Sequence, residues 1–79
     1  MTREDIYERL NEVFRDVFDD VLISVDDNTT AEDIDGWDSL MHITLIEAVE
    51  EEFDISFDMK TVVKMKNVGE MVDAIEEAI

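Results

Sequence analysis

The chain has 79 residues, with 23 acidic and 6 basic side chains and a formal net charge of −17 at pH 7. This charge excludes direct binding to nucleic acids and to anionic membranes, because both require cationic groups. The absence of cysteine excludes disulfides, thiolate metal sites and cysteine nucleophiles. No apolar run approaches the roughly 20 residues of a membrane span, and the amino-terminal residues lack the apolar centre of a signal peptide. We expect a cytoplasmic monomer whose protein partners carry basic patches.

Apolar residues at helical spacing predict a first helix over about residues 3–18. Thr2 is placed to cap this helix, with acidic residues in its first turn. Residues 19–38 have no sustained period and contain the turn-forming run Asp26-Asp27-Asn28-Thr29-Thr30, so they predict a long connection. The apolar side chains expected to pin this connection to the core are Val21, Leu22, Ile23, Val25 and Ile34.

A second helix is predicted from Ser39 to about Phe53, followed by a short extended link. Its buried stripe is expected to comprise Ile43, Ile46, Val49 and Phe53. The glutamates at 50–52 lie near its carboxyl end, where they oppose the helix dipole. Local stability does not select such an arrangement, so the glutamates favour a role in docking to a partner.

Asp58 is placed to cap a short third helix over about residues 59–65. Its inward-facing side chains are expected to be Val62, Val63 and Met65. Asn67 and Glu70 have the spacing of a capping box and open a last helix. The apolar stripe of this last helix would comprise Val68, Met71, Val72, Ile75 and Ile79. The expected fold is all-α: a four-helix bundle, with three longer helices and one short third helix, in one domain over residues 1–79.

The run Asp35-Gly36-Trp37-Asp38-Ser39-Leu40 closes a loop onto the serine that opens the second helix. A hydroxyl at a helix start faces solvent beside backbone N–H groups that have no helical partner. These groups and the helix dipole favour a phosphate ester at that position. A purely structural interpretation competes, because Ser39 or Asp38 can also serve as a simple helix cap.

Gly36-Trp37-Asp38-Ser39-Leu40, followed by Glu50-Glu51-Glu52-Phe53-Asp54-Ile55, resembles the acyl carrier protein and peptidyl carrier protein family. The resemblance covers essentially the whole chain. It implies a 4′-phosphopantetheine arm joined to Ser39 through a phosphodiester, with Asp38 and Leu40 completing the attachment site. Acyl or aminoacyl groups would be carried as thioesters on this arm. By this resemblance the chain is a carrier and not an enzyme, served by a phosphopantetheinyl transferase and by acyl-loading and acyl-transferring enzymes.

Three positions depart from the pattern of housekeeping fatty-acid carriers, and one of them is Thr44, which stands where the family often has an acid early in the second helix. Trp37 precedes Asp-Ser-Leu where those carriers usually have a small residue, and Met41 follows it in place of an acid. These departures favour a dedicated pathway, with polysaccharide or lipid modification, a polyketide-like route and aminoacyl transfer as candidates. The residues expected to dock partner enzymes are Met41, Glu47, Glu50, Glu51 and Asp54.

Other interpretations remain open at this point. An unmodified acidic helical module that binds proteins would explain the charge, but not the turn that precedes Ser39. An enzyme with Ser39, His42 and Asp38 as a triad is disfavoured, because the three lie within about one helical turn and no oxyanion hole is evident. We expect His42 to be an exposed surface residue and Trp37 a partly buried anchor. The aspartates of the connection lack the spacing of a calcium-binding loop, so no metal site is predicted.

Overall fold

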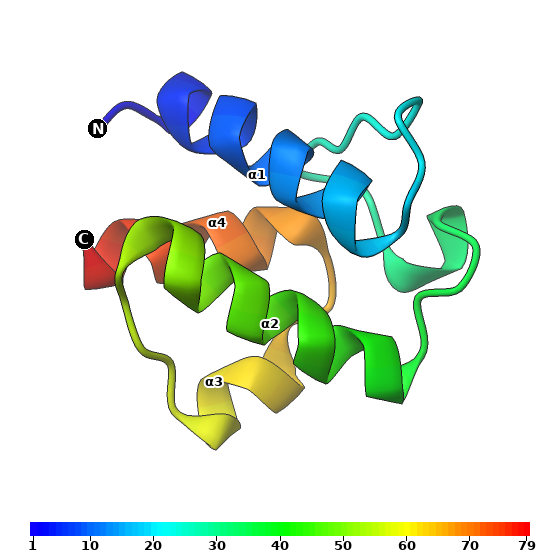
Figure 1. Cartoon of the computed structure of the whole chain (residues 1–79). Helices are drawn as coiled ribbons and strands as arrows, with labels where there is room; N and C mark the ends of the chain where they lie inside the picture. Colours follow the sequence, from blue (N-terminus) through cyan, green and yellow to red (C-terminus); the bar gives the residue numbers. More distant parts are fainter.

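The computed structural model describes residues 1–79 and is built of helices and connecting loops (Figure 1). Helix α1 spans Arg3–Val17, α2 spans Ser39–Phe53, α3 spans Met59–Lys64 and α4 spans Val68–Ala78. The all-α, four-helix architecture predicted from the sequence is confirmed. Both chain ends lie at one end of the bundle, and the start of α2 lies at the other. None of the helices combines the length and apolar character needed to cross a bilayer.

Side-chain caps fix where the helices begin. Thr2 accepts the backbone N–H of Asp5 at 3.1 Å, and the Asp5 carboxylate accepts that of Thr2 at 3.2 Å, which together form a capping box. Asp58 accepts the N–H of Thr61 at 2.8 Å, and this hydrogen bond lowers the pKa of the Asp58 carboxyl. The capping prediction for α4 was half right. Asn67 caps the helix as expected. The Glu70 carboxylate, however, accepts the backbone N–H of Lys66 and not that of Asn67, so the capping box is incomplete.

The core is a single cluster of 14 buried hydrophobic residues. Helices α1, α2 and α4 each contribute residues one helical turn apart, as the periodicity required. Each large side chain removed from water contributes about 2 kcal/mol to folding. The buried residues are Ile6, Leu10, Val13, Phe14, Val25, Leu45, Ile46, Val49, Phe53, Val62, Val68, Met71, Val72 and Ile75.

Several predicted core positions are exposed. Ile43 is 41% exposed, because it lies at the edge of the buried stripe, and Leu45 lies nearer its centre. Val21 and Leu22 are 82% and 87% exposed, since the chain turns outward after the left-handed residue Asp19. Val63 and Ile79 are also exposed: α3 is too short to bury two neighbouring valines, and Ile79 lies beyond the end of α4.

Polar contacts hold the long connection between α1 and α2 in place. The connection also contains a short 3-10 helix, Ala31–Asp33, which the sequence did not predict. Val25 N–H donates to the side chain of Asn11 at 2.7 Å. The carbonyls of Asp27 and Thr29 accept the first N–H groups of α4, from Gly69 at 3.1 Å and Val68 at 2.8 Å. The connection therefore caps α4 with its own backbone.

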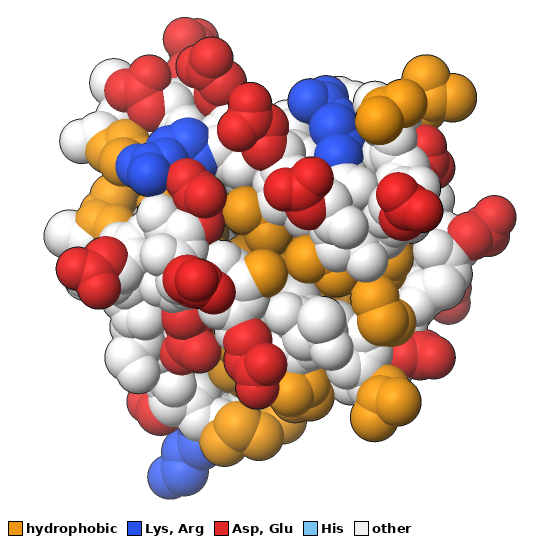
Figure 2. All heavy atoms as spheres, in the orientation of Figure 1, with side chains coloured by type: hydrophobic (Ala, Val, Ile, Leu, Met, Phe, Trp, Pro, Cys, Tyr) orange, Lys and Arg blue, Asp and Glu red, His pale blue; other side chains and the backbone are white.

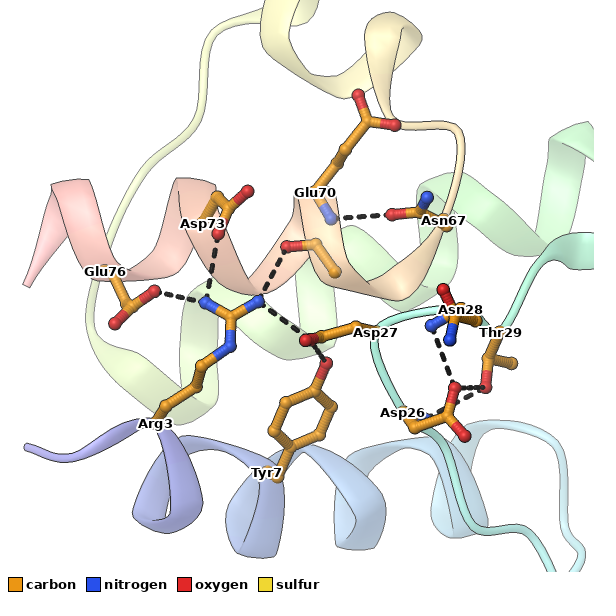
Figure 3. Close-up of polar contacts among 11 residues, drawn as sticks. Arg3, Tyr7, Asp26, Asp27, Asn28, Thr29, Asn67, Glu70, Asp73 and Glu76 are labelled. Atoms are coloured by element: carbon orange, nitrogen blue, oxygen red, sulfur yellow. Dashed lines mark hydrogen bonds and ion pairs between the residues drawn. The ribbon is translucent and has the colours of Figure 1, made fainter.

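A group of charged side chains ties α1, the connection and α4 together, and we call it the Arg3 clamp (Figure 3). It consists of Arg3, Tyr7, Asp27, Asp73 and Glu76. The Arg3 guanidinium pairs with Asp27 at 2.7 Å, with Asp73 at 3.0 Å and with Glu76. The hydroxyl of Tyr7 donates to Asp27. This hydrogen bond, together with Arg3, lowers the pKa of the Asp27 carboxyl, whereas burial and Asp27 raise the pKa of the Tyr7 hydroxyl.

Candidate functional site

Ser39 is the first residue of α2, and the residues before it shape the helix start. Gly36 has φ +85°, a left-handed conformation that favours glycine and turns the chain toward the helix. Asp38 is the N-cap, and its Oδ1 accepts the backbone N–H of Met41 at 2.8 Å. Ser39 is exposed, and the N–H groups of Ser39 and Leu40 have no hydrogen-bond partner in the protein. An anion bonded to the Ser39 hydroxyl would meet these N–H groups and the positive end of the helix dipole.

A cleft of about 510 Å³ begins at Ser39 and lies among the starts of α2 and α4 and the helix α3. Its lining is largely hydrophobic and includes Trp37, Ile43, Val62 and Met71. A larger hollow of about 770 Å³ lies under the connection, and aspartates line much of it. This hollow does not include Ser39, and the chain has no group of side chains arranged to hold a metal ion.

Trp37 anchors the end of the connection, as predicted. Its ring meets Phe14 edge-on at 5.3 Å between centroids and lies 6.1 Å from Phe18. The indole Nε1–H donates to Nδ1 of His42 at 3.1 Å. The anchor therefore connects the loop before Ser39 both to α1 and to the first turn of α2.

The prediction of a surface-exposed His42 was wrong. The ring is partly buried and lies edge to edge with Trp37, with 22° between the ring planes, and its Nε2 lies 3.2 Å from the carbonyl oxygen of Val62. The contact was missed because the partners of His42 come from a loop and from α3, which helical periodicity does not place. Both ring nitrogens are engaged away from Ser39, so His42 does not form a triad with Ser39 and Asp38 in this structure.

The predicted docking residues divide into two groups. Glu47, Glu51 and Asp54 are exposed and make no ion pair or side-chain hydrogen bond. Met41 and Glu50 are only half-exposed. Glu50 accepts the backbone N–H of Phe57 at 2.7 Å, so it holds the link between α2 and α3.

Arg9 offsets the unfavourable negative charge at the carboxyl end of α2, a contact that the sequence analysis did not predict. Arg9 pairs with the Glu52 carboxylate at 2.9 Å and donates to the Glu52 carbonyl at 3.2 Å. Its guanidinium also lies over the ring of Phe53, 5.3 Å from the centroid. A cation at this end of a helix offsets the dipole. The acidic residues that remain without such a role are Glu47, Glu51 and Asp54.

Comparison with known proteins identifies the fold and the family. The phosphopantetheine attachment site family matches residues 8–75, a range that includes Ser39. The solution NMR structure of a holo acyl carrier protein from Geobacter metallireducens is 41% identical in sequence and has a TM-score of 0.84. The match covers 90% of this chain and 82% of that protein. No curated protein gives a significant match. The chain thus belongs to the phosphopantetheine attachment site family and is an acyl carrier protein, with covalently attached phosphopantetheine as its cofactor.

Proposed function

We propose that the hydroxyl of Ser39 is the attachment point of the phosphopantetheine arm. The observation that carries this proposal is the position of Ser39: an exposed hydroxyl on the first residue of α2, beside two unpaired N–H groups and at the mouth of a cleft. These features fit a phosphodiester. The other serines, Ser24 and Ser56, lie in connecting segments with no helix start beside them.

The chain positions this serine and leaves its activation to another protein. Asp38 fixes the first turn of α2 and so sets the direction of the Ser39 side chain. His42 is not available to Ser39 as a base, because both of its ring nitrogens are engaged elsewhere. We assign the base to the phosphopantetheinyl transferase. When bound, the arm supplies a thiol that carries acyl or aminoacyl groups as thioesters, and the chain itself catalyses no step.

The exposed side of α2 is the surface proposed to meet partner enzymes. Leu40, 80% exposed, lies about two turns before Glu47, and Glu51 follows one turn later on the same side. We call Leu40, Glu47 and Glu51 the docking face, bordered by Met41, Glu50 and Asp54. Figure 2 shows carboxylates spread over the visible surface with hydrophobic side chains between them, including over α3 and the first half of α2. A partner that fits this face has a basic patch beside an apolar pocket.

The attachment is tested by mass spectrometry after co-expression with a broad-specificity phosphopantetheinyl transferase. The wild-type chain should gain the mass of one arm, and Ser39→Ala should gain none. Ser24→Ala and Ser56→Ala are matched controls that should gain the arm like the wild type. An unchanged mass of the wild-type chain, or a gain that survives Ser39→Ala, would overturn the proposal.

The docking face is tested with a double charge reversal, Glu47→Lys with Glu51→Lys. Arm attachment by the same transferase at low salt should slow by about tenfold, and its salt dependence should flatten. The control is Glu8→Lys with Glu12→Lys. It makes the same charge change at the same spacing on α1, where both glutamates are exposed and make no ion pair. Equal rates for the two double variants would contradict the docking face.

We further infer that the protein acts in the cytoplasm as a monomer of one domain, residues 1–79, in a dedicated biosynthetic pathway. Trp37 and Met41 support the dedicated pathway. Trp37 gives the Ser39 cleft an aromatic wall, and Met41 removes an acid from the recognition surface. Mass spectrometry of the acyl groups on the protein, purified from its own host, tests this inference. A cargo restricted to intermediates of general fatty-acid synthesis would contradict it.

A further inference from the structure

His42 connects three elements around the Ser39 cleft. Trp37 belongs to the loop that precedes α2, His42 to the first turn of α2, and Val62 to α3. Two contacts join them, at 3.1 Å from Trp37 Nε1 to His42 Nδ1 and at 3.2 Å from His42 Nε2 to the Val62 carbonyl oxygen. All three residues line the cleft that begins at Ser39. We call this chain of contacts the His42 bridge.

The two partners of the ring require one protonation state. The indole N–H of Trp37 is only a donor, so Nδ1 of His42 must be its acceptor. The carbonyl oxygen of Val62 is only an acceptor, so Nε2 must carry the hydrogen and donate it. The bridge is therefore complete only with the neutral Nε2–H tautomer. A second proton, on Nδ1, would place two donors against each other and break the contact with Trp37.

Two side-chain hydrogen bonds link α2 to the segment that contains α3. One is the contact of His42 with Val62, and the other runs from the Phe57 N–H to Glu50, before α3 begins. The bridge holds the far end of α3, whose packing into the core rests on Val62. Without the hydrogen bond to His42, the indole keeps its contacts with Phe14 and Phe18 but has no polar group that fixes its direction. We therefore expect the indole to change its tilt within the cleft while the fold stays intact.

We propose that neutral His42 is a positioning residue for the group attached at Ser39: it holds Trp37 and α3 on two sides of the cleft, and gaining a proton releases Trp37. This inference rests on the proposed attachment at Ser39. The bridge and the release of Trp37 can, however, be tested on the protein without the arm. Asp38 and Lys66 are the other ionisable side chains that line the cleft. The residues of α3 and α4 that line it, Val62, Val63 and Met71, are not ionisable. Phe14 of α1 and Phe18, which follows α1, contact Trp37.

The test uses the single tryptophan and the single histidine of the chain as reporters. In the protein without the arm, nitrogen NMR at about pH 8 should show a proton on Nε2 of His42 and none on Nδ1. The Trp37 indole N–H should exchange with solvent at least about tenfold more slowly than that of free tryptophan. The second pH is an acidic one at which the same nitrogen NMR shows a proton on both ring nitrogens of His42; there this protection should be lost while the helical circular dichroism stays unchanged.

Two substitutions separate the bridge from general packing. In His42→Gln, the amide offers an acceptor to Trp37 and a donor to Val62 but does not titrate. Indole protection should therefore persist at both pH values. In His42→Leu, protection should be absent at both. The proposal is overturned if the wild-type indole exchanges freely at about pH 8, if its protection is equal at the two pH values, or if His42→Gln loses protection on acidification as the wild type does.

The consequence for the arm is read from the phosphorus NMR signal of the protein with the arm attached. A phosphodiester does not itself titrate in this pH range, so we expect the signal to shift in step with the protonation of His42 that nitrogen NMR follows. The shift should be absent in His42→Gln and at least halved in Trp37→Phe. A full shift in Trp37→Phe would mean a direct effect of the histidine charge and would contradict positioning through Trp37. Failure of the arm to attach would instead refute the proposed function, with the exchange results on the bridge still standing.

Discussion

The Arg3 clamp and the Trp37 anchor hold two parts of the same connection with different chemistry. The clamp is a set of ion pairs between the half-buried Arg3 and exposed carboxylates, and it joins Asp27 to α1 and α4. The anchor is a half-buried indole against Phe14 and Phe18, with one hydrogen bond to His42. Exposed ion pairs contribute little and are screened by salt, whereas buried aromatic surface is insensitive to salt. We therefore expect the residues next to Ser39 to keep their arrangement at salt concentrations that loosen the clamp.

The largest expected effect comes from removing the anchor. Trp37→Ala should lower the free energy of unfolding by about 2 kcal/mol, because it empties the space beside Phe14 and Phe18. Trp37→Phe keeps an aromatic ring but loses the hydrogen bond to His42, and should cost about 1 kcal/mol. Urea unfolding followed by circular dichroism measures both. If Trp37→Ala lowers the free energy of unfolding by less than Arg3→Met, which breaks the clamp, the anchor is not the stronger of the two.

Each region also contains one glycine, and the two are needed for different reasons. A Cβ at Gly69 would lie 2.7 Å from the backbone oxygen of Asp27, so Gly69→Ala should push the connection off α4 at a cost of about 1–2 kcal/mol. Gly36 has open space around it but a φ of +85°, so Gly36→Ala should cost about 1 kcal/mol through backbone strain. Thermal unfolding of both variants tests the distinction. Only Gly69→Ala should also disturb the amide signals of residues 27–29.

Breaking the clamp itself should have a smaller effect that depends on salt. Arg3→Met removes the cation that separates the carboxylates of Asp27, Asp73 and Glu76, which then repel one another. The melting temperature should fall at low ionic strength, and most of the loss should disappear in high salt. The wild-type chain should itself gain stability with salt, because its net charge is −17. A loss for Arg3→Met that is the same at every salt concentration would contradict an electrostatic clamp.

The smallest expected effect concerns acid unfolding. The Tyr7 hydrogen bond is the main cause that lowers the pKa of Asp27, with Arg3 next. A carboxyl whose pKa is lower in the folded protein stabilises the fold above its unfolded value of about 3.9, and this contribution disappears as the pH falls through the folded value. Tyr7→Phe should therefore move the acid unfolding midpoint slightly toward neutral pH. An acid midpoint identical to that of the wild type would show that the hydrogen bond is not coupled to folding.

The longer helices could be predicted because their apolar residues recur with the helical period, and the end residues of α2 agree with the structure. The position of Ser39 at the start of α2 could also be predicted, since a helix start is a local feature; its role as the attachment point remains a proposal. Local pattern could not place Val21 and Leu22, because burial in a loop depends on the path of the backbone. It also could not find the partners of Arg3 and His42. Asp73 lies 70 residues after Arg3, and Val62 lies 20 residues after His42, so only the folded chain brings them together.

The attachment of the arm to the first residue of α2 is the central claim, and intact protein from its own host tests it most directly. The protein is purified during active growth and digested, and the peptide that contains Ser39 is sequenced by tandem mass spectrometry. The account predicts that this peptide carries the phosphopantetheine mass at Ser39, with Ser24 and Ser56 unmodified. A Ser39 found bare in every preparation, or an arm located on another residue, would contradict it.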